Sequence, residues 1–150
     1  MKKLVAAIVL TLAVFGAASM GLAIGDRQPP VRFDGVRVLT THVAPGQDLE
    51  IEYSLHRYRF CDVTGRRWLT DASGTTFAIS TYTRGDAPDL GPESYRRAIT
   101  VPESAVPGPA TYFIELAYTC NLIHRLGWPI RVSSPPAHFD IVERPDMGGA

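Results

Sequence analysis

The stretch DLEIEYSLHRYRF (residues 48–60) alternates apolar and polar side chains with a period of two. The apolar positions of its first part all fall on one face of an extended chain: Leu49, Ile51, Tyr53 and Leu55. This alternation predicts a β-strand with one buried face. The phase shifts by one residue where Tyr58 and Phe60 become the apolar positions, which predicts a β-bulge near His56–Arg57.

A second strong strand is predicted in ATYFIELAYTC (residues 110–120), with Tyr112, Ile114, Leu116 and Tyr118 on one face. Its other face also carries apolar groups, so we expect this strand to be central. Weaker strands are predicted by the same pattern in four segments: 36–43, 66–80 (two strands in a hairpin around Ser73–Gly74), 94–102 and 137–142. Short strands separated by Pro/Gly turns are typical of an antiparallel β-sandwich.

Two Pro-Gly turns lead into the two strong strands, in APGQDLEIEYSLHR (44–57) and VPESAVPGPATYFIELAY (101–118). This arrangement resembles the bacterial immunoglobulin-like modules found on exported proteins, and the resemblance covers residues 36–143. It implies an all-β fold, an immunoglobulin-like antiparallel β-sandwich of about seven strands. Trp68 follows Cys61 by only seven residues, so the antibody subfamily itself is not expected. The chain is also similar to small, uncharacterised signal-bearing proteins of bacteria and their phages.

The N-terminus has the order of an export signal, with Lys2 and Lys3 followed by 22 uncharged residues from Leu4 to Gly25. The same run is long enough to span a bilayer as a helix. A cleaved signal peptide and a retained N-terminal membrane anchor therefore both remain open for residues 1–25. Either alternative leaves the lysines inside and places the rest of the chain in the periplasm, free or anchored to the inner membrane.

The remaining chain is expected to divide into a linker (26–35), the sandwich (36–143) and a disordered tail (144–150). Both lysines lie in the N-terminal segment, and without them the formal net charge of zero becomes about −2. Such a balance does not favour nucleic acid as a partner. No serine-hydrolase, zinc-protease or phosphate-loop motif occurs in the sequence, so we expect no enzyme and no cofactor.

The two cysteines, Cys61 and Cys120, each end a strong predicted strand. In a sandwich these strands run in the same direction in opposite sheets, so their ends meet at one pole. Exported thiols meet an oxidising compartment, and a disulfide closing a loop of about 59 residues is our main expectation. An alternative is a Zn or Cu site formed by His56, Cys61, Cys120 and His124, and free buried cysteines are a third possibility.

Arginine and aromatic residues are concentrated around the two cysteines, and arginine and tryptophan are frequent in binding hot spots. The candidate binding surface comprises Arg57, Arg59, Arg66, Arg67, His124, Arg125 and Trp128. The competing interpretation is structural, with Trp68 and Trp128 in the core and the arginines on solvated strand faces. The segment CNLIHRLGWPIRV (120–132) is expected to be a loop at the recognition end of the sandwich.

These observations predict an exported, non-enzymatic binding or structural module of the cell envelope that is stabilised by a disulfide. Its N-terminal segment would contact the membrane, and its partner would be an envelope protein or a glycan. The alternative function is a periplasmic metal-binding (Cu/Zn) domain that uses the His/Cys cluster.

Overall fold

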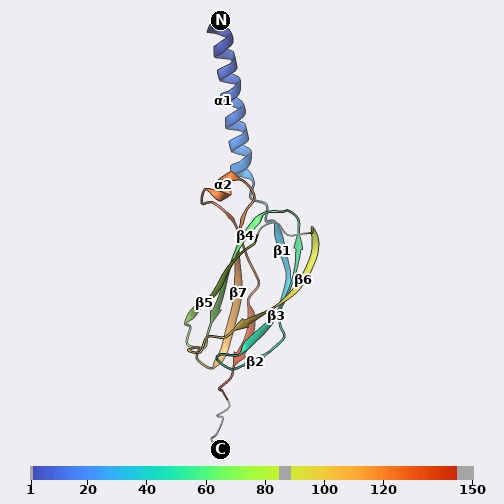
Figure 1. The fold of residues 1–150 in the computed structure, drawn as a ribbon, viewed down its shortest axis with the longest axis vertical. Coiled ribbons are helices and arrows are strands. Elements are labelled where there is room, and N and C mark those ends of the chain that lie inside the picture. The colour runs from blue at the N-terminus through green and yellow to red at the C-terminus, as the bar shows by residue number, and fades with distance from the viewer. Residues whose placement is uncertain (1, 85–88, 145–150) are drawn as a thin grey trace, which may run out of the picture.

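A computed structural model describes residues 2–84 and 89–144, in which an N-terminal helix projects from a domain built mainly of β-strands (Figure 1). The elements in chain order are α1 (Lys2–Gly25), β1 (Val31–Val38), β2 (His42–Val43), β3 (Asp48–Arg57), β4 (Asp62–Thr70), β5 (Thr76–Arg84), β6 (Gly91–Thr100), β7 (Gly108–Thr119), α2 (Leu122–Arg125), β8 (Ile130–Ser133) and β9 (Ala137–Ile141).

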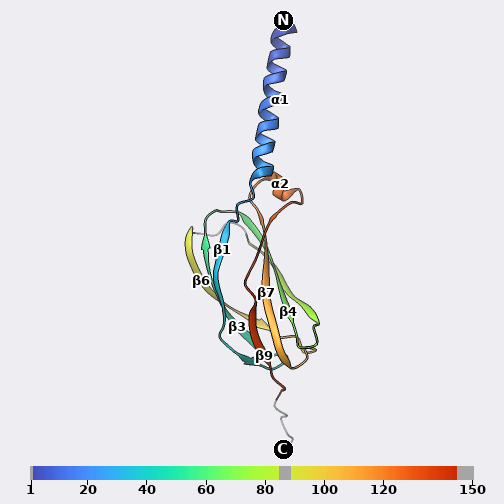
Figure 2. The same ribbon diagram turned by 180° about the vertical axis from the view of Figure 1, so that it is seen from behind.

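The strands form two sheets, which Figure 2 shows from behind. The first has the order β1-β3-β6, and the second has the order β2-β9-β7-β4-β5, with β8 added beside β7. All pairings are antiparallel except that of β2 with β9, which is parallel. The sheets do not close on each other, because β5 and β6 are each the last strand of a sheet.

One hydrophobic core lies between the sheets, and the two strong strands of the sequence supply its centre. The predicted apolar faces of both strands are buried: Leu49, Ile51, Tyr53 and Leu55 on β3, and Tyr112, Ile114, Leu116 and Tyr118 on β7. The hydroxyls of Tyr53 and Tyr112 meet across the core at 2.7 Å, so each phenol supplies the other's hydrogen-bond partner. The period-two analysis of these strands is therefore confirmed.

Four expectations from the sequence are corrected. The described residues contain nine strands rather than about seven, because the strand predicted over 36–43 is divided between β1 and β2 and because β8 was not anticipated. The expected linker 26–35 is too long, since β1 begins at Val31, which is buried. The tail does not begin at Arg144, whose guanidinium donates to Pro45 O and Glu103; residues 145–150 lie outside the described residues.

The fourth correction concerns the shift of phase near His56–Arg57. No bulge lies there: β3 stays in register with β6 up to Arg57, and the strand then ends. Arg57 continues the buried face of β3 and pairs with Glu93 at 2.8 Å. Tyr58 and Phe60, which suggested a new apolar face, are instead about half exposed beyond the strand.

The hairpin predicted around Ser73–Gly74 is confirmed, and Asp71 holds its turn. The Ser73 hydroxyl donates to Asp71 Oδ1 at 2.6 Å, and the Val106 N–H donates to Oδ2 at 2.9 Å. These bonds, that of Ser73 foremost, lower the pKa of Asp71 because they favour its ionised form. The turn between β4 and β5 is thereby fastened to the segment that precedes β7.

Candidate functional site

The end of the domain next to α1 is formed by two segments, Tyr58–Cys61 and Cys120–Pro129, which we call the helix-proximal pole. Cys61 and Cys120 form a disulfide there, with their Cα atoms 4.6 Å apart. Cys61 lies where the chain passes from β3 in one sheet to β4 in the other, and Cys120 follows β7. The expected bridge is confirmed, but the expectation that it joins strands of opposite sheets was wrong. Cys61 does not end β3 but directly precedes β4, which is the antiparallel neighbour of β7 in the same sheet, with Asp62 opposite Thr119.

The turn of helix α2 gives the pole its local structure. Asn121 is its N-cap, with an extended backbone and a side-chain oxygen that accepts from His124 N at 3.0 Å. The helix stops after one turn because Gly127, at φ 115°, reverses the chain in a conformation that side chains disfavour. α2 thus lies within the segment that was expected to be entirely loop.

His124 is buried and connects α2 to the segment that follows α1. Its Nδ1 accepts from Cys120 N at 3.2 Å, so in the neutral ring the proton resides on Nε2. Nε2 then donates to the backbone oxygen of Asp26 at 3.0 Å. Both ring nitrogens are therefore used for positioning the chain.

Further polar contacts join the C-terminal end of α1 to the same pole. Asn121 Nδ2 donates to Ala23 O at 3.1 Å and so satisfies one of the free carbonyls at the end of the helix. The Asp26 carboxylate receives two bonds from Arg59, at 2.6 and 2.7 Å, and this pairing lowers the pKa of Asp26. The helix is thus bound to the domain by neutral and by charged contacts.

Arg27 and Trp128 complete the junction. The Arg27 guanidinium lies over the Trp128 ring, 3.9 Å from its centroid, and donates to Trp128 O at 2.9 Å. The ring itself remains 57% exposed. Four other large apolar side chains at this pole are about half exposed or more: Tyr58, Phe60, Leu122 and Leu126. Apolar groups thus surround the point where α1 leaves the domain.

The candidate binding surface divides into separate places. Arg59, His124, Arg125 and Trp128 lie together at the helix-proximal pole, where Arg125 pairs with Asp62 at 3.4 Å. The other three do not join them: Arg57 is buried between the two sheets, Arg66 is exposed on the outer face of β4, and Arg67 is on the face of β4 that is turned toward the core. Neither tryptophan is buried, so placing Trp68 and Trp128 in the core was wrong.

The His/Cys quartet does not form a metal site in this structure. The sulfurs of Cys61 and Cys120 are bonded to each other, and both nitrogens of His124 are engaged with backbone groups. His56 lies on β3 with its ring 4.7 Å from that of Tyr58. Within residues 2–84 and 89–144, no group of three or more potential ligands is placed to hold a metal ion.

Three residues of the junction, Asp26, Arg27 and Asn121, were missed by the sequence analysis. Asn121 had a readable signal, since an asparagine before a short apolar segment is a favoured helix N-cap. Asp26 and Arg27 had none, because their partners lie far away in sequence, at Arg59 and Trp128.

No family model matches the chain, and no curated protein matches it. Solved structures that match include the Pseudomonas fluorescens alkylpurine DNA glycosylase AlkC bound to DNA containing an abasic site analog. That match has a TM-score of 0.47 and 11% identity, over 77% of this chain and 31% of the glycosylase. The Bacillus subtilis sporulation control protein Spo0M matches with a TM-score of 0.39 and 12% identity, over 79% of this chain and 51% of that one. The chain spans about a third and about half of these proteins, respectively.

Proposed function

We propose that the chain is an exported envelope protein, anchored in the inner membrane by α1, whose immunoglobulin-like sandwich faces the periplasm as a non-enzymatic binding or structural module. The observation that carries the proposal is the junction itself, in which the backbone of α1 at Ala23 is hydrogen-bonded to the pole that holds the disulfide. A disulfide suits a compartment outside the cytosol.

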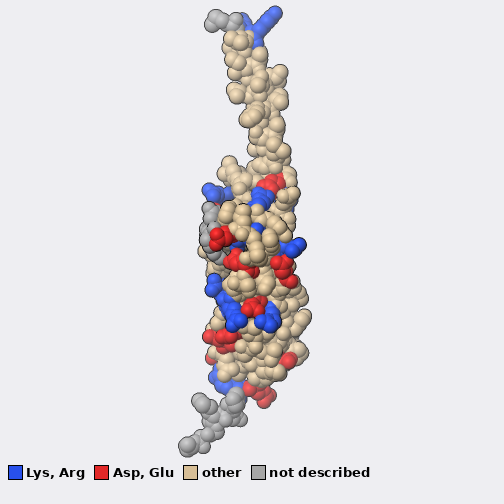
Figure 3. Space-filling view, turned by 90° about the vertical axis from the view of Figure 1, so that its right-hand side faces the viewer, with Lys and Arg blue, Asp and Glu red and all other residues tan. Residues whose placement is uncertain are grey.

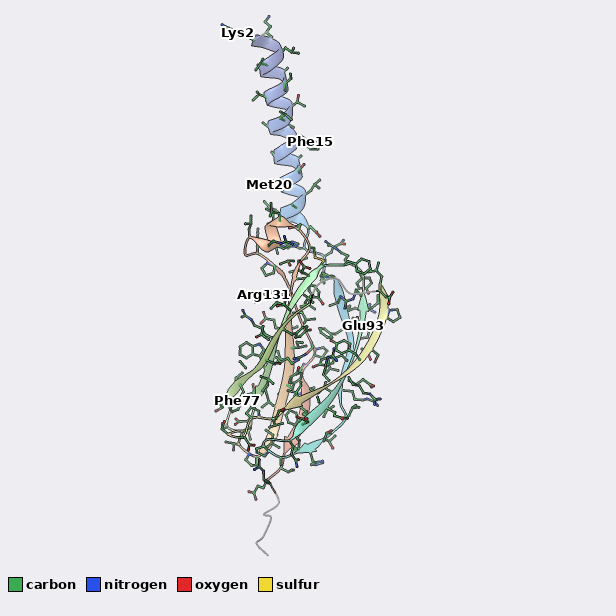
Figure 4. All side chains as sticks on the ribbon, in the orientation of Figure 1. Lys2, Phe15, Met20, Phe77, Glu93 and Arg131 are labelled. Carbon is green, nitrogen blue, oxygen red and sulfur yellow. A yellow bond between two sulfur atoms is a disulfide. The ribbon has the colours of Figure 1, made fainter. Side chains whose placement is uncertain are left out.

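The surface of α1 supports the anchor. None of its residues is buried against the domain. The helix is apolar enough and long enough to cross a bilayer. At 24 residues the helix extends about 36 Å, which exceeds the hydrocarbon thickness of about 30 Å. Figure 3 shows a helix surface without charge between its basic N-terminal tip and the domain. Phe15 and Met20 project outward from opposite sides in Figure 4.

The strand order supports the immunoglobulin-like assignment. The sheets β1-β3-β6 and β9-β7-β4-β5 correspond to the A-B-E and G-F-C-C′ orders of immunoglobulin domains. The disulfide departs from the antibody pattern, because Cys61 directly precedes β4 and Cys120 directly follows β7, which are neighbouring strands of one sheet. The parallel pairing of β2 with β9 is a further addition.

The exposed apolar groups of the helix-proximal pole fit the surface of a bilayer. A helix that enters the membrane at Gly25 brings Leu122, Leu126 and Trp128 to the level of the lipid headgroups. Tryptophan is enriched at that level, where its ring is half in hydrocarbon and half in a polar medium. In this arrangement α2 lies on the membrane, and the apolar exposure at the pole is removed from water.

Retention of α1 is tested by intact-mass analysis of the full-length chain from a bacterial membrane fraction. The expected product retains residues 1–25 and is lighter than the reduced chain by about 2 Da, the two hydrogens lost when one disulfide forms. Replacing Leu10 and Leu12 with arginine should release the chain from the membrane, because each charge at the helix centre costs about 3 kcal/mol. The matched control is Leu90→Arg, an exposed leucine outside the helix, which should stay in the membrane fraction. A soluble product without α1 would contradict the anchor.

Contact of the pole with lipid is tested by fluorescence quenching in vesicles that contain brominated lipids. With Trp68→Phe, the remaining Trp128 should be quenched. With Trp128→Phe, the remaining Trp68 should not be, since it lies seven strand residues, or about 23 Å, beyond Cys61. Equal quenching of the two tryptophans, or quenching of neither, would exclude the proposed orientation.

A further inference from the structure

A cleft of about 300 Å³ opens on the side of the domain where the two sheets do not close, and four residues line it: Arg67, Tyr82, Tyr95 and Arg97. We call it the Arg–Tyr cleft. It lies between β5 and β6, the last strands of their sheets. Figure 4 marks these strands by Phe77 on β5 and Glu93 on β6.

The strand registers direct all four side chains toward the inside of the sandwich. On β4, Arg67 is opposite Ile114, a buried residue of β7, so it shares the inward face. On β6, Tyr95 is opposite Tyr53 and Arg97 is opposite Ile51, and both of these partners are buried.

Tyr82 reaches the cleft because its neighbour on β4 has no side chain. Gly65 is opposite Tyr82, and the Tyr82 ring occupies the space that a Cβ at Gly65 would need. The register between β4 and β5 shifts next to Arg67, and such irregularities re-aim nearby side chains. The shift leaves Ser80 opposite Arg67, where its hydroxyl accepts from the guanidinium at 2.7 Å.

Both guanidinium groups of the cleft rest on tyrosine rings. Arg67 lies over Tyr82 at 4.7 Å from the ring centroid, and Arg97 lies over Tyr95 at 5.3 Å. Tyr95 is itself stacked on Tyr53 at 5.1 Å, so this wall of the cleft is continuous with the core. A guanidinium held over a ring by cation–π attraction does not use its N–H donors for that contact.

The positive charge of the cleft lacks a compensating carboxylate. Within the part of the chain that the structure describes, neither Arg67 nor Arg97 forms an ion pair, and the buried Nε of Arg67 has no acceptor. The neighbouring inward arginine differs, because Arg57 is paired with Glu93 at 2.8 Å. Arg97 is exposed to solvent and Arg67 is half-buried, so the cost of a buried donor without an acceptor falls on the Nε of Arg67 alone.

Protection of a sheet edge does not account for this arrangement. Inward-pointing charges on edge strands discourage edge-to-edge aggregation, and this explains the position of Arg97 on β6. Arg67, however, is on β4, which is paired on both sides, with β7 and β5. A charge in that position needs a different reason.

We propose that the Arg–Tyr cleft binds the oxyanion group of a small ligand, a carboxylate or a phosphate, between the guanidinium groups of Arg67 and Arg97. The anion accepts the free Nε–H of Arg67 and the N–H groups of the exposed Arg97. The cleft volume admits a group of about the size of one sugar ring. This inference goes beyond the membrane anchor and does not depend on it.

The test uses the oxidised full-length chain in detergent micelles at physiological salt, titrated with inorganic phosphate, with glucuronate and with neutral glucose. Binding is measured by calorimetry and by the NMR signal of the Arg67 Nε–H group. We expect saturable binding of at least one anion in the millimolar range or tighter, with a shift of the Nε–H signal. Whether phosphate or glucuronate binds more tightly identifies the oxyanion as phosphate or carboxylate.

Arg97→Gln should weaken anion binding roughly tenfold or more, the effect of removing one charged hydrogen-bonding partner. The matched control is Arg96→Gln, which removes the same charge from the preceding residue of β6, on the outer face where Arg96 bonds to Glu52. This control should bind like the unmodified chain. The proposal is overturned if neither anion shifts the Nε–H signal, if glucose binds as well as glucuronate, or if both variants weaken binding equally.

Discussion

Removal of the Cys61–Cys120 bridge should cost this domain a large part of its stability. The bridge joins residues 59 apart in sequence, and a loop of that length restrains the unfolded chain by about 4 kcal/mol on the chain-entropy model. Small domains have about 5–15 kcal/mol in total, so we expect the bridged domain to survive conditions that unfold the unbridged one. The bridge also ties the segment between β3 and β4 to the end of β7, so its loss should loosen the helix-proximal pole first.

The assay is urea unfolding of the full-length chain in detergent, followed by tryptophan fluorescence. With a slope of about 2 kcal/mol per molar urea, the midpoint of Cys61→Ser/Cys120→Ser should fall by about 2 M. Reduction of the unmodified chain by a phosphine separates the effect of the bond from that of the changed side chains, and it should lower the midpoint by a similar amount. If the midpoint falls by less than about 0.5 M in both experiments, the argument from loop entropy is refuted.

Three further predictions concern the core and the β4–β5 turn, and each is measured by the midpoint of urea unfolding. Tyr53→Phe should cost about 1–2 kcal/mol because it leaves the buried Tyr112 hydroxyl without its partner, whereas Tyr53→Phe/Tyr112→Phe should cost less than the single change. Gly65→Ala should cost about 1–3 kcal/mol by overpacking against Tyr82, and Gly65→Ala/Tyr82→Leu should recover most of the loss. Because its pKa is lowered on folding, Asp71 stabilises the fold above about pH 4, and this stabilisation is lost as the pH falls through the lower folded pKa. Asp71→Asn should therefore be less stable at neutral pH and show a weaker loss of stability in acid; an unchanged acid profile would contradict this assignment.

The sequence could predict those parts of the fold that repeat with a local period. The buried faces of β3 and β7 follow from alternation alone, because every second side chain of a strand points the same way. The hairpin around Ser73–Gly74 also follows from local turn chemistry. β2 and β8, with two and four residues, are too short to display a period, and they pair only because other strands present an open edge.

Charged residues that point between the two sheets could not be identified from local sequence patterns. Arg57 lies on the same face of β3 as Leu49 and Leu55, but a charged residue is not predicted to belong to a buried apolar face. Its burial depends on Glu93, a residue 36 positions away on β6. The same holds for Arg67, whose inward direction is set by its pairing with β7. Long-range pairing therefore decided which arginines reached the helix-proximal pole and which did not.

The helix and the last described residues lie at opposite ends of the molecule (Figure 1), which has a consequence for anything attached beyond Arg144. β7 alone, at 12 residues, spans about 40 Å along the domain. A fluorophore or fusion partner placed after Arg144 would be carried at about that distance from the exit point of α1. The β-domain therefore separates a group attached after Arg144 from the point where α1 leaves the domain.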